Sequence, residues 1–154
     1  MIGLKPLPTL QLGDALPQVT ANNQQGAPEN LADHATAPWL LVYFYPKANT
    51  PGCTAQACSL RDHWDDLLAA GIEVIGVSKD SVRSQQKFSQ QKNLPFTLLA
   101  DEQGIVADAF GVPHLAGVTK RSAFLFHHGS LTWKDLAAST TQQAADVLKV
   151  VQNS

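Results

Sequence analysis

The chain contains two cysteines, Cys53 and Cys58, which directly follow or lie just beyond the loop PKANTPG. Two cysteines are too few for a scaffold held together by disulfides, and a chain of 154 residues can bury a core without them. Their short spacing puts both thiols in one local element. In a protein of a reducing compartment, such a pair indicates metal binding or thiol redox chemistry.

The position of Cys53 favours a reactive thiol. A cysteine reacts as its thiolate, and a free thiol with a pKa of about 8.5 is only about 3% ionised at pH 7. Pro51 and Gly52 predict a helix start, and the unpaired N–H groups of a first helical turn stabilise an anion. Complete ionisation raises the rate by no more than about 30-fold. Fast chemistry at Cys53 therefore needs further groups that act on the other reactant.

The segments around Cys53 alternate between strand and helix patterns. The run WLLVYFY at 39–45 predicts a central strand that is covered on both faces, and Pro46 ends it. A helix that begins near Cys53 and stops at Gly71 is predicted by apolar residues at helical spacing, namely Leu60, Trp64, Leu67 and Leu68. Further patterns predict strands at 72–77 and 97–100, helices at 81–92 and 105–110, a hairpin of strands 123–126 and 131–136, and a last helix carrying Ala144, Val147, Leu148 and Val151.

This order predicts an α/β domain of three layers, with parallel crossovers at its start and an antiparallel pair at its end. The segment before residue 36 is rich in Pro, Asn, Gln and Gly, and it predicts a short strand near 17–20 and a turn around Gly26. Ligands of such sheets bind beyond the carboxyl ends of the parallel strands. The loop with Thr50 and Cys53 is expected at that edge.

The composition predicts one globular domain over residues 1–154. Apolar residues make up 44% of the chain and charged residues 16%, and the net charge is −2, which disfavours disorder and a nucleic-acid partner. The longest apolar stretch, at 37–45, is too short to span a membrane. The N-terminal sequence has a lysine and two prolines where a signal peptide needs a basic start and a continuous apolar segment, so we expect a cytoplasmic protein.

The spacing of Pro46, Thr50 and Cys53 resembles the PxxxTxxC motif of the peroxiredoxins. The surrounding YFYPKANTPGCTAQAC is similar to the bacterioferritin-comigratory or Q-type branch, and KRSAFLF resembles the later strand of the family that begins with arginine. The similarity runs from about residue 16 to the last helix. It implies a thioredoxin-like fold, a central mixed sheet flanked by helices, and reduction of hydroperoxides without a metal or organic cofactor.

The resemblance also implies roles for individual residues. Cys53 matches the peroxidatic cysteine, and Cys58 lies at the Q-type spacing for a resolving thiol. Thr50 and Arg121 are candidates to donate hydrogen bonds to the sulfur and to the departing peroxide oxygen. Pro46, which has no N–H, would shield the sulfur from water. A thioredoxin-like reductant and a monomer are the implied partner and assembly state.

Two expectations concern the resolving step and the neighbours of the site. Residues five apart in one regular helix have Cα atoms ~8.5 Å apart, whereas a disulfide tolerates at most about 7 Å. We therefore predict that the first turns of the helix unwind when Cys53 and Cys58 bond. Gln56 and Ala123 stand where many Q-type members have Glu and Thr, which leaves the role of that carboxylate open in this chain.

Other readings of the same residues remain open at this point. A thiol-disulfide oxidoreductase is disfavoured because CxxxxC replaces CxxC, and a redox-sensing or binding module would be oxidised once where an enzyme turns over. Two buried structural thiols or a zinc site are further alternatives, although the five histidines form no second pair at ligand spacing. His127 and His128 are expected to flank a hairpin turn in solvent, and Trp39, Trp64 and Trp133 to pack in or near the core.

Overall fold

The sheet is built around β3 (Trp39–Phe44), whose six residues are all buried. The computed structural model describes residues 8–154. Seven strands pair in the order β2-β1-β5-β4-β3-β8-β9, and β3, β4 (Ile72–Ser78) and β5 (Thr97–Ala100) run parallel. The antiparallel members are β1 (Thr20–Asn23), β2 (Pro28–Asn30), β8 (Ser122–His127) and β9 (Ser130–Asp135). The predicted mixed sheet with its parallel centre is confirmed.

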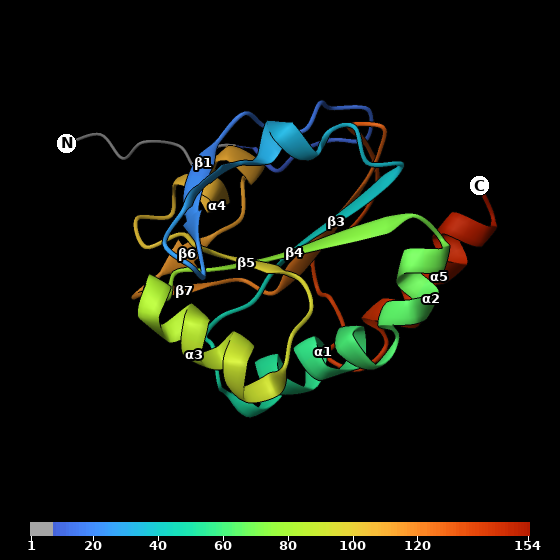
Figure 1. Ribbon diagram of the computed structural model, residues 1–154. Coiled ribbons are helices and arrows are strands. Elements are labelled where there is room, and N and C mark those ends of the chain that lie inside the picture. Colours follow the sequence, from blue (N-terminus) through green and yellow to red (C-terminus); the bar gives the residue numbers. More distant parts are fainter. Residues whose placement is uncertain (1–7) are drawn as a thin grey trace.

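Helices cover both faces of this sheet, which gives the three predicted layers (Figure 1). One face carries α1 (Pro51–Asp62), α2 (Trp64–Ala69), α3 (Val82–Lys92) and α5 (Gln143–Gln152), and the other carries α4 (Ile105–Phe110) and the short 3-10 helix η1 (Leu31–His34). Strand residues alternate between the two cores: Leu41 and Tyr43 face the α1 layer, whereas Leu40 and Val42 face the α4 layer. The sequence of β3 is apolar throughout because each of its faces packs against one of these two cores.

The predicted helix at 81–92 is α3, which begins at Val82. Ser81 is the cap, and its side chain accepts a hydrogen bond from the Ser84 N–H group at 3.1 Å. At the end of α4, Gly111 adopts a left-handed φ of +69° and leaves no room for a side chain, since a Cβ would lie 2.4 Å from the Pro8 carbonyl oxygen. The segment that contains Pro8 therefore packs directly over this turn.

Several predicted elements differ from the structure. The single helix expected up to Gly71 is two helices, interrupted at His63, and Leu68 is 54% exposed and not on the core side. The N-terminal strand lies at Thr20–Asn23 and not at 17–20, and it forms a hairpin with β2 around the predicted turn at Gly26. A small hairpin of β6 (His114–Leu115) and β7 (Val118–Thr119) was not expected.

The turn between β8 and β9 corrects one expectation about the histidines. His128 and Gly129 have φ values of +47° and +80°, and they form the exposed turn as predicted. His127 is not in solvent, because its ring packs edge-on against Trp39 with centroids 4.0 Å apart. Trp39 is buried, and Trp64 and Trp133 pack partly buried against the same core, as expected.

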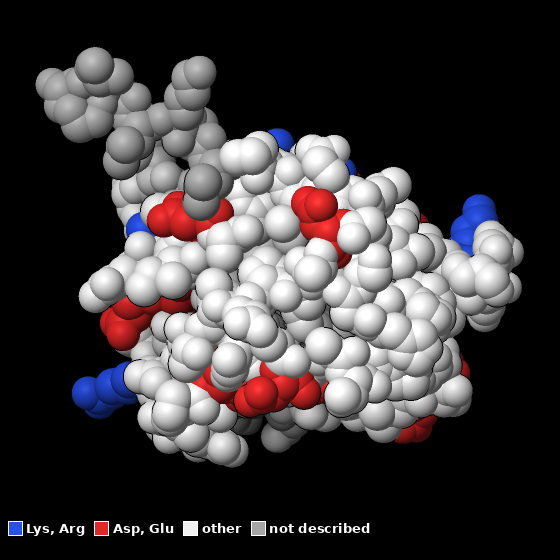
Figure 2. Space-filling model, turned by 90° about the horizontal axis from the view of Figure 1, so that it is seen from above, with Lys and Arg blue, Asp and Glu red and all other residues white. Residues whose placement is uncertain are grey.

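Charged side chains are sparse on the face opposite to α1. Figure 2 shows this face, with scattered acidic groups and basic groups near its outline.

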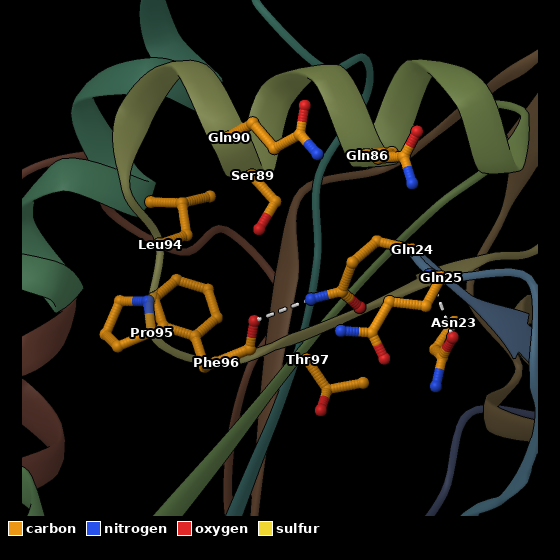
Figure 3. Close-up of a pocket in the computed structure, with 10 residues that line it drawn as sticks. All are labelled: Asn23, Gln24, Gln25, Gln86, Ser89, Gln90, Leu94, Pro95, Phe96 and Thr97. Carbon is orange, nitrogen blue, oxygen red and sulfur yellow. Dashed lines mark hydrogen bonds between the residues drawn. The ribbon is translucent and has the colours of Figure 1, made fainter.

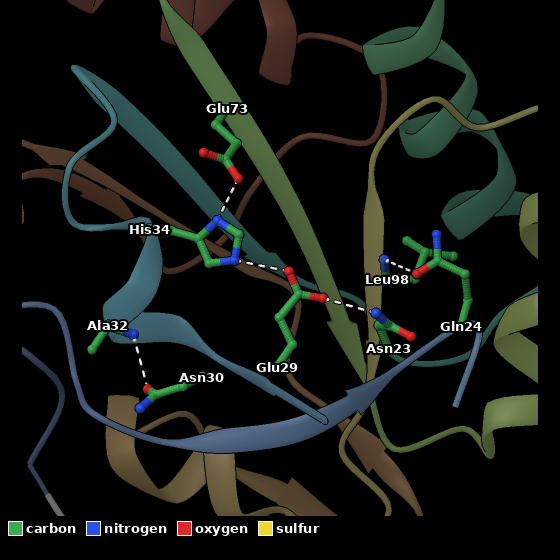
Figure 4. Close-up of polar contacts among 8 residues, drawn as sticks. All are labelled: Asn23, Gln24, Glu29, Asn30, Ala32, His34, Glu73 and Leu98. Carbon is green, nitrogen blue, oxygen red and sulfur yellow. Dashed lines mark hydrogen bonds and ion pairs between the residues drawn. The ribbon is translucent and has the colours of Figure 1, made fainter. Parts of the chain in front are cut away.

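In Figure 4, His34 lies between Glu29 of β2 and Glu73 of β4 and contacts a carboxylate with each ring nitrogen. Within residues 8–154, no helix has the length and apolar character that a bilayer crossing requires.

Candidate active site around Cys53

The loop between β3 and α1 lies at the carboxyl edge of the parallel strands, as predicted. It is anchored by Asp80, which follows the neighbouring strand β4. The Asp80 Oδ2 atom accepts a hydrogen bond from the Ala48 N–H group at 2.8 Å and one from the Ser78 hydroxyl at 2.6 Å. Asn49 takes a left-handed φ of +63°, which turns the chain into the helix. The backbone of α1 then begins with the bond from the Thr54 N–H group to the Thr50 carbonyl at 2.8 Å.

Cys53 lies in the first turn of α1 and is a free thiol that is 1% exposed. The N–H groups at the start of α1 have no partners within the helix, and the positive end of its dipole lies beside the sulfur. Arg121 adds a second positive group, since its Nη2 atom donates to the Cys53 Sγ atom at 3.5 Å. The sulfur is thus shielded from bulk water and lies against two sources of positive potential.

Arg121 reaches this position because of the register of the sheet. It directly precedes β8, whose first residue, Ser122, pairs with Phe44 at the carboxyl end of β3. The chain just before it is fixed by the Thr119 hydroxyl, which donates to the Tyr45 carbonyl at 3.0 Å. The guanidinium packs over Gly52, where a Cβ would lie 3.1 Å from Arg121 Nη2. A glycine at position 52 therefore allows the close approach.

Gln56, one helical turn after Cys53, is a part of the site whose role the sequence left open. Its side chain is fully buried, and its Oε1 atom accepts a short hydrogen bond from Arg121 Nη1. Its Nε2 atom donates to Oε1 of Gln143, the first residue of α5, at 3.0 Å. The site therefore contains a continuous polar chain from the Cys53 sulfur through Arg121 and Gln56 to Gln143.

Thr50 is the residue directly before α1 and Pro46 lies at the start of the same loop, and both are partly buried. The Thr50 hydroxyl donates to the Lys47 carbonyl at 2.7 Å, and it does not cap the helix. A hydrogen bond from Thr50 to the sulfur or to a peroxide therefore requires the hydroxyl to rotate. The roles of Thr50 as a donor and of Pro46 as a shield stay predictions.

Cys58 lies on the same unbroken helix as Cys53 and is also a free thiol, partly buried. Regular helix geometry separates the two Cα atoms by ~8.5 Å, beyond the reach of a disulfide of about 7 Å. The structure thus describes the dithiol form. The unwinding predicted for the oxidised form stays a prediction.

Two buried tyrosines lie near the site. Burial raises the pKa of Tyr43 and Tyr45 well above that of an exposed phenol, so both are neutral at physiological pH. The Tyr45 hydroxyl donates to Gln85 Oε1, whereas the Tyr43 hydroxyl has no hydrogen-bond partner among the described residues. Neither phenol is suited to accept a proton from Cys53, because a tyrosine acts as a base only in its phenolate form.

Possible metal ligands and one large pocket can be compared with the position of Cys53. Residues 8–154 contain no cluster of three or more His, Cys, Asp or Glu side chains that could hold a metal ion. A pocket of about 360 Å³ lies between α3, β5 and the turn after β1, and half of its lining residues carry amide side chains, among them Gln25, Gln86 and Gln90 (Figure 3). None of the residues that contact Cys53 lines that pocket.

Comparison with known proteins agrees with the geometry. Residues 12–134 match the AhpC/TSA family model. The chain is 43% identical over 104 residues to a putative peroxiredoxin Bcp of Coxiella burnetii and 47% identical over 103 residues to peroxiredoxin Bcp of Escherichia coli. These alignments cover 68% and 67% of this chain, and 68% and 65% of the two relatives. The matched segment thus spans about two thirds of the length of these relatives.

Solved structures extend the similarity over nearly the whole chain. The crystal structure of peroxidoxin BcpB from Mycobacterium tuberculosis superposes with a TM-score of 0.87 at 29% identity, covering 94% of this chain and 97% of that one. The bacterioferritin comigratory protein of Xanthomonas campestris, described for its alkyl peroxide reduction activity, superposes with a TM-score of 0.81 at 28% identity, covering 91% and 98%. The chain therefore belongs to the AhpC/TSA family and, within it, is a peroxiredoxin of the Bcp and Q type, a group of thiol peroxidases.

Proposed function

We propose that this chain reduces hydrogen peroxide and organic hydroperoxides through Cys53, with Cys58 as the resolving thiol. The observation that carries the proposal is the guanidinium of Arg121, which donates to the buried Cys53 sulfur at the start of a helix. A positive group beside the sulfur both favours the thiolate and faces the region in which a peroxide oxygen becomes negative. Repeated turnover, and not this first step, is what distinguishes an enzyme from a sensor that is oxidised once.

The first chemical step is attack of the Cys53 thiolate on one peroxide oxygen. The S–O bond forms while the O–O bond breaks, and the electron pair of that bond leaves with the distal oxygen as alkoxide or hydroxide. Protonation of this leaving group gives alcohol or water, and Cys53 becomes a sulfenic acid. Arg121 stabilises the developing negative charge, and Thr50 is positioned to donate to the peroxide after its hydroxyl rotates.

The second step converts the sulfenic acid into a disulfide. The Cys58 sulfur attacks the Cys53 sulfur, an S–S bond forms, and the sulfenic oxygen leaves as water. This step requires the first turns of α1 to unwind, because the two cysteines are five residues apart on one helix. The resulting disulfide is local, and a thioredoxin-like dithiol then reduces it to restore both thiols.

The proposal includes the setting of the reaction. We infer a cytoplasmic enzyme, because a cycle that ends with reduction by a thioredoxin-like dithiol requires a reducing compartment. A resolving cysteine on the same helix needs no second subunit, which supports a monomer. We also propose that the described residues, 8–154, form one thioredoxin-like domain; residues 1–7 of the domain predicted from the sequence lie outside the described part of the chain.

Cysteine variants test this assignment. With thioredoxin, thioredoxin reductase and NADPH, we expect the wild-type protein to consume hydrogen peroxide over many turnovers, and C53S to be inactive. The C58S variant is expected to react once and to retain one added oxygen by intact mass. Full multiple-turnover activity of C53S, or oxidation of the wild-type protein without repeated turnover, would contradict the proposal.

A further inference from the structure

We propose that Gln143 is a positioning residue for the peroxidase reaction, acting through Gln56 to hold Arg121 against the Cys53 sulfur. The inference rests on the proposed peroxidase function of this site. Gln143 is 87 positions after Gln56 in the sequence, yet the two amides are 3.0 Å apart because the start of α5 packs against α1. Nothing in the pattern around Gln143 marks it as part of the site.

The chemistry of the amide groups supports this assignment. Arginine offers only hydrogen-bond donors, so Gln56 must present its oxygen to Arg121. The Gln56 NH₂ group then points away from Arg121 into a fully buried environment, where it requires an acceptor. Gln143 Oε1 is that acceptor. Gln143 thus selects the orientation of Gln56 in which the oxygen faces Arg121.

Gln143 makes this contact at a cost to itself. Its side chain is 2% exposed, and its own Nε2 atom is buried without a hydrogen-bond partner. The opposite orientation of its amide would place two NH₂ groups against each other. An apolar residue at this position would leave no orphaned donor on α5, but it would orphan the buried NH₂ group of Gln56 instead. The arrangement is explained by the acceptor that Gln143 supplies to Gln56.

The orientation of Gln56 affects the contact with the Cys53 sulfur because Arg121 binds both Gln56 and the sulfur. Its Nη1 atom donates to Gln56 and its Nη2 atom donates to Cys53 Sγ at 3.5 Å. Two bonds to one planar guanidinium fix its orientation as well as its position. If Gln56 loses its preferred orientation, the first bond is lost and Nη2 is no longer aimed at the sulfur.

The test is a double-mutant cycle with hydrogen peroxide in single-turnover stopped flow. Q143M keeps the length and burial of the side chain but removes the acceptor, and we expect it to slow sulfenic acid formation about fivefold to tenfold, the equivalent of one hydrogen bond. Q143E keeps an acceptor toward Gln56, and we expect its rate within about twofold of wild type. The exposed neighbour Gln142 provides the control, with Q142M unchanged.

The R121M background separates positioning from a general structural defect. If Gln143 acts through Arg121, Q143M has no further effect once Arg121 is absent. An equal loss from Q143M in both backgrounds would overturn the inference, as would a wild-type rate in Q143M or a Q143E variant as slow as Q143M.

Alkylation of Cys53 by iodoacetamide in C58S variants gives a second readout that needs no peroxide. We expect Q143M to slow it only in the presence of Arg121, and an Arg121-independent effect would overturn the inference. Failure of the proposed peroxidase function would be recognised separately, as a wild-type peroxide rate no faster than that of free cysteine.

Discussion

Replacement of Arg121 by methionine distinguishes stabilisation of the transition state from stabilisation of the thiolate. The Arg121 Nη2 atom lies 3.5 Å from the Cys53 sulfur. Two unit charges at that distance attract by about 5 kcal/mol at an effective dielectric constant of about 20, and solvent around the partly exposed arginine lowers this value. During attack, negative charge moves from sulfur to the departing oxygen, so a donor that reaches both atoms retains most of the attraction.

We expect R121M to lower the second-order rate constant for hydrogen peroxide by about 100-fold to 1,000-fold, equivalent to about 3 to 4 kcal/mol. A change in ionisation alone accounts for at most about 30-fold, because a free thiol is already about 3% ionised at pH 7. The larger loss is expected because R121M also removes the donor that faces the departing oxygen.

The assay compares two reactions of the same thiol in a C58S background. Stopped flow measures the reaction with peroxide, and alkylation by iodoacetamide measures the availability of the thiolate without charge developing on an oxygen. K120M, which removes the exposed neighbouring cation, is the control and is expected to change either rate by no more than about twofold. Equal losses in both reactions of R121M would refute a role for Arg121 in the transition state.

Three further predictions follow from the geometry. Gly52→Ala places a Cβ 3.1 Å from Arg121 Nη2, so we expect peroxide reduction to be about threefold to tenfold slower. We expect no loss of thermal stability, because Ala favours a helix over Gly by about 1 kcal/mol. An unchanged rate would contradict the close packing of Gly52 and Arg121. Oxidation to the intramolecular disulfide is expected to remove hydrogen-exchange protection in the first turns of α1, because helix geometry leaves the Cα atoms ~8.5 Å apart, and equal protection in both redox states would contradict the unwinding. The pKa of His34 is raised, chiefly by its hydrogen bond to Glu73. The stability that protonated His34 contributes is therefore fully present below about pH 6.5 and is lost as the pH rises through the folded-state pKa. The difference in melting temperature between wild type and His34→Gln should shrink over that window, and a difference independent of pH would argue against this effect.

The sequence predicts the central elements of the fold because their local patterns agree with their tertiary roles. The run at 39–45 is apolar throughout, and β3 is buried on both faces. Ser81 caps α3 where the polar pattern begins. The first strand lies later than predicted because TANN is polar, and its position is set by pairing with β5 and β2 and not by its own hydrophobicity.

The site was predictable only in part, because some of its contacts depend on packing between distant elements and not on local sequence. Thr50 and Cys53 lie in one loop-helix segment, so their spacing carries information, and Arg121 was found through the similarity of the strand that follows it. The partnership of Gln56 with Gln143 depends on how α5 packs against α1, which no local pattern records. The interruption at His63 also escaped prediction, because apolar spacing continues across the two helices.

In the proposed cycle, Cys53 reduces a peroxide and Cys58 resolves the product within the same chain. The most direct test is a single turnover of the fully reduced protein with one equivalent of hydrogen peroxide, followed by peroxide loss, free thiols and intact mass together. We expect rapid loss of peroxide, disappearance of both thiols, and a monomer lighter by two hydrogens. Peroxide loss no faster than with free cysteine would contradict the enzymatic role, and a disulfide-linked dimer would contradict resolution within one chain.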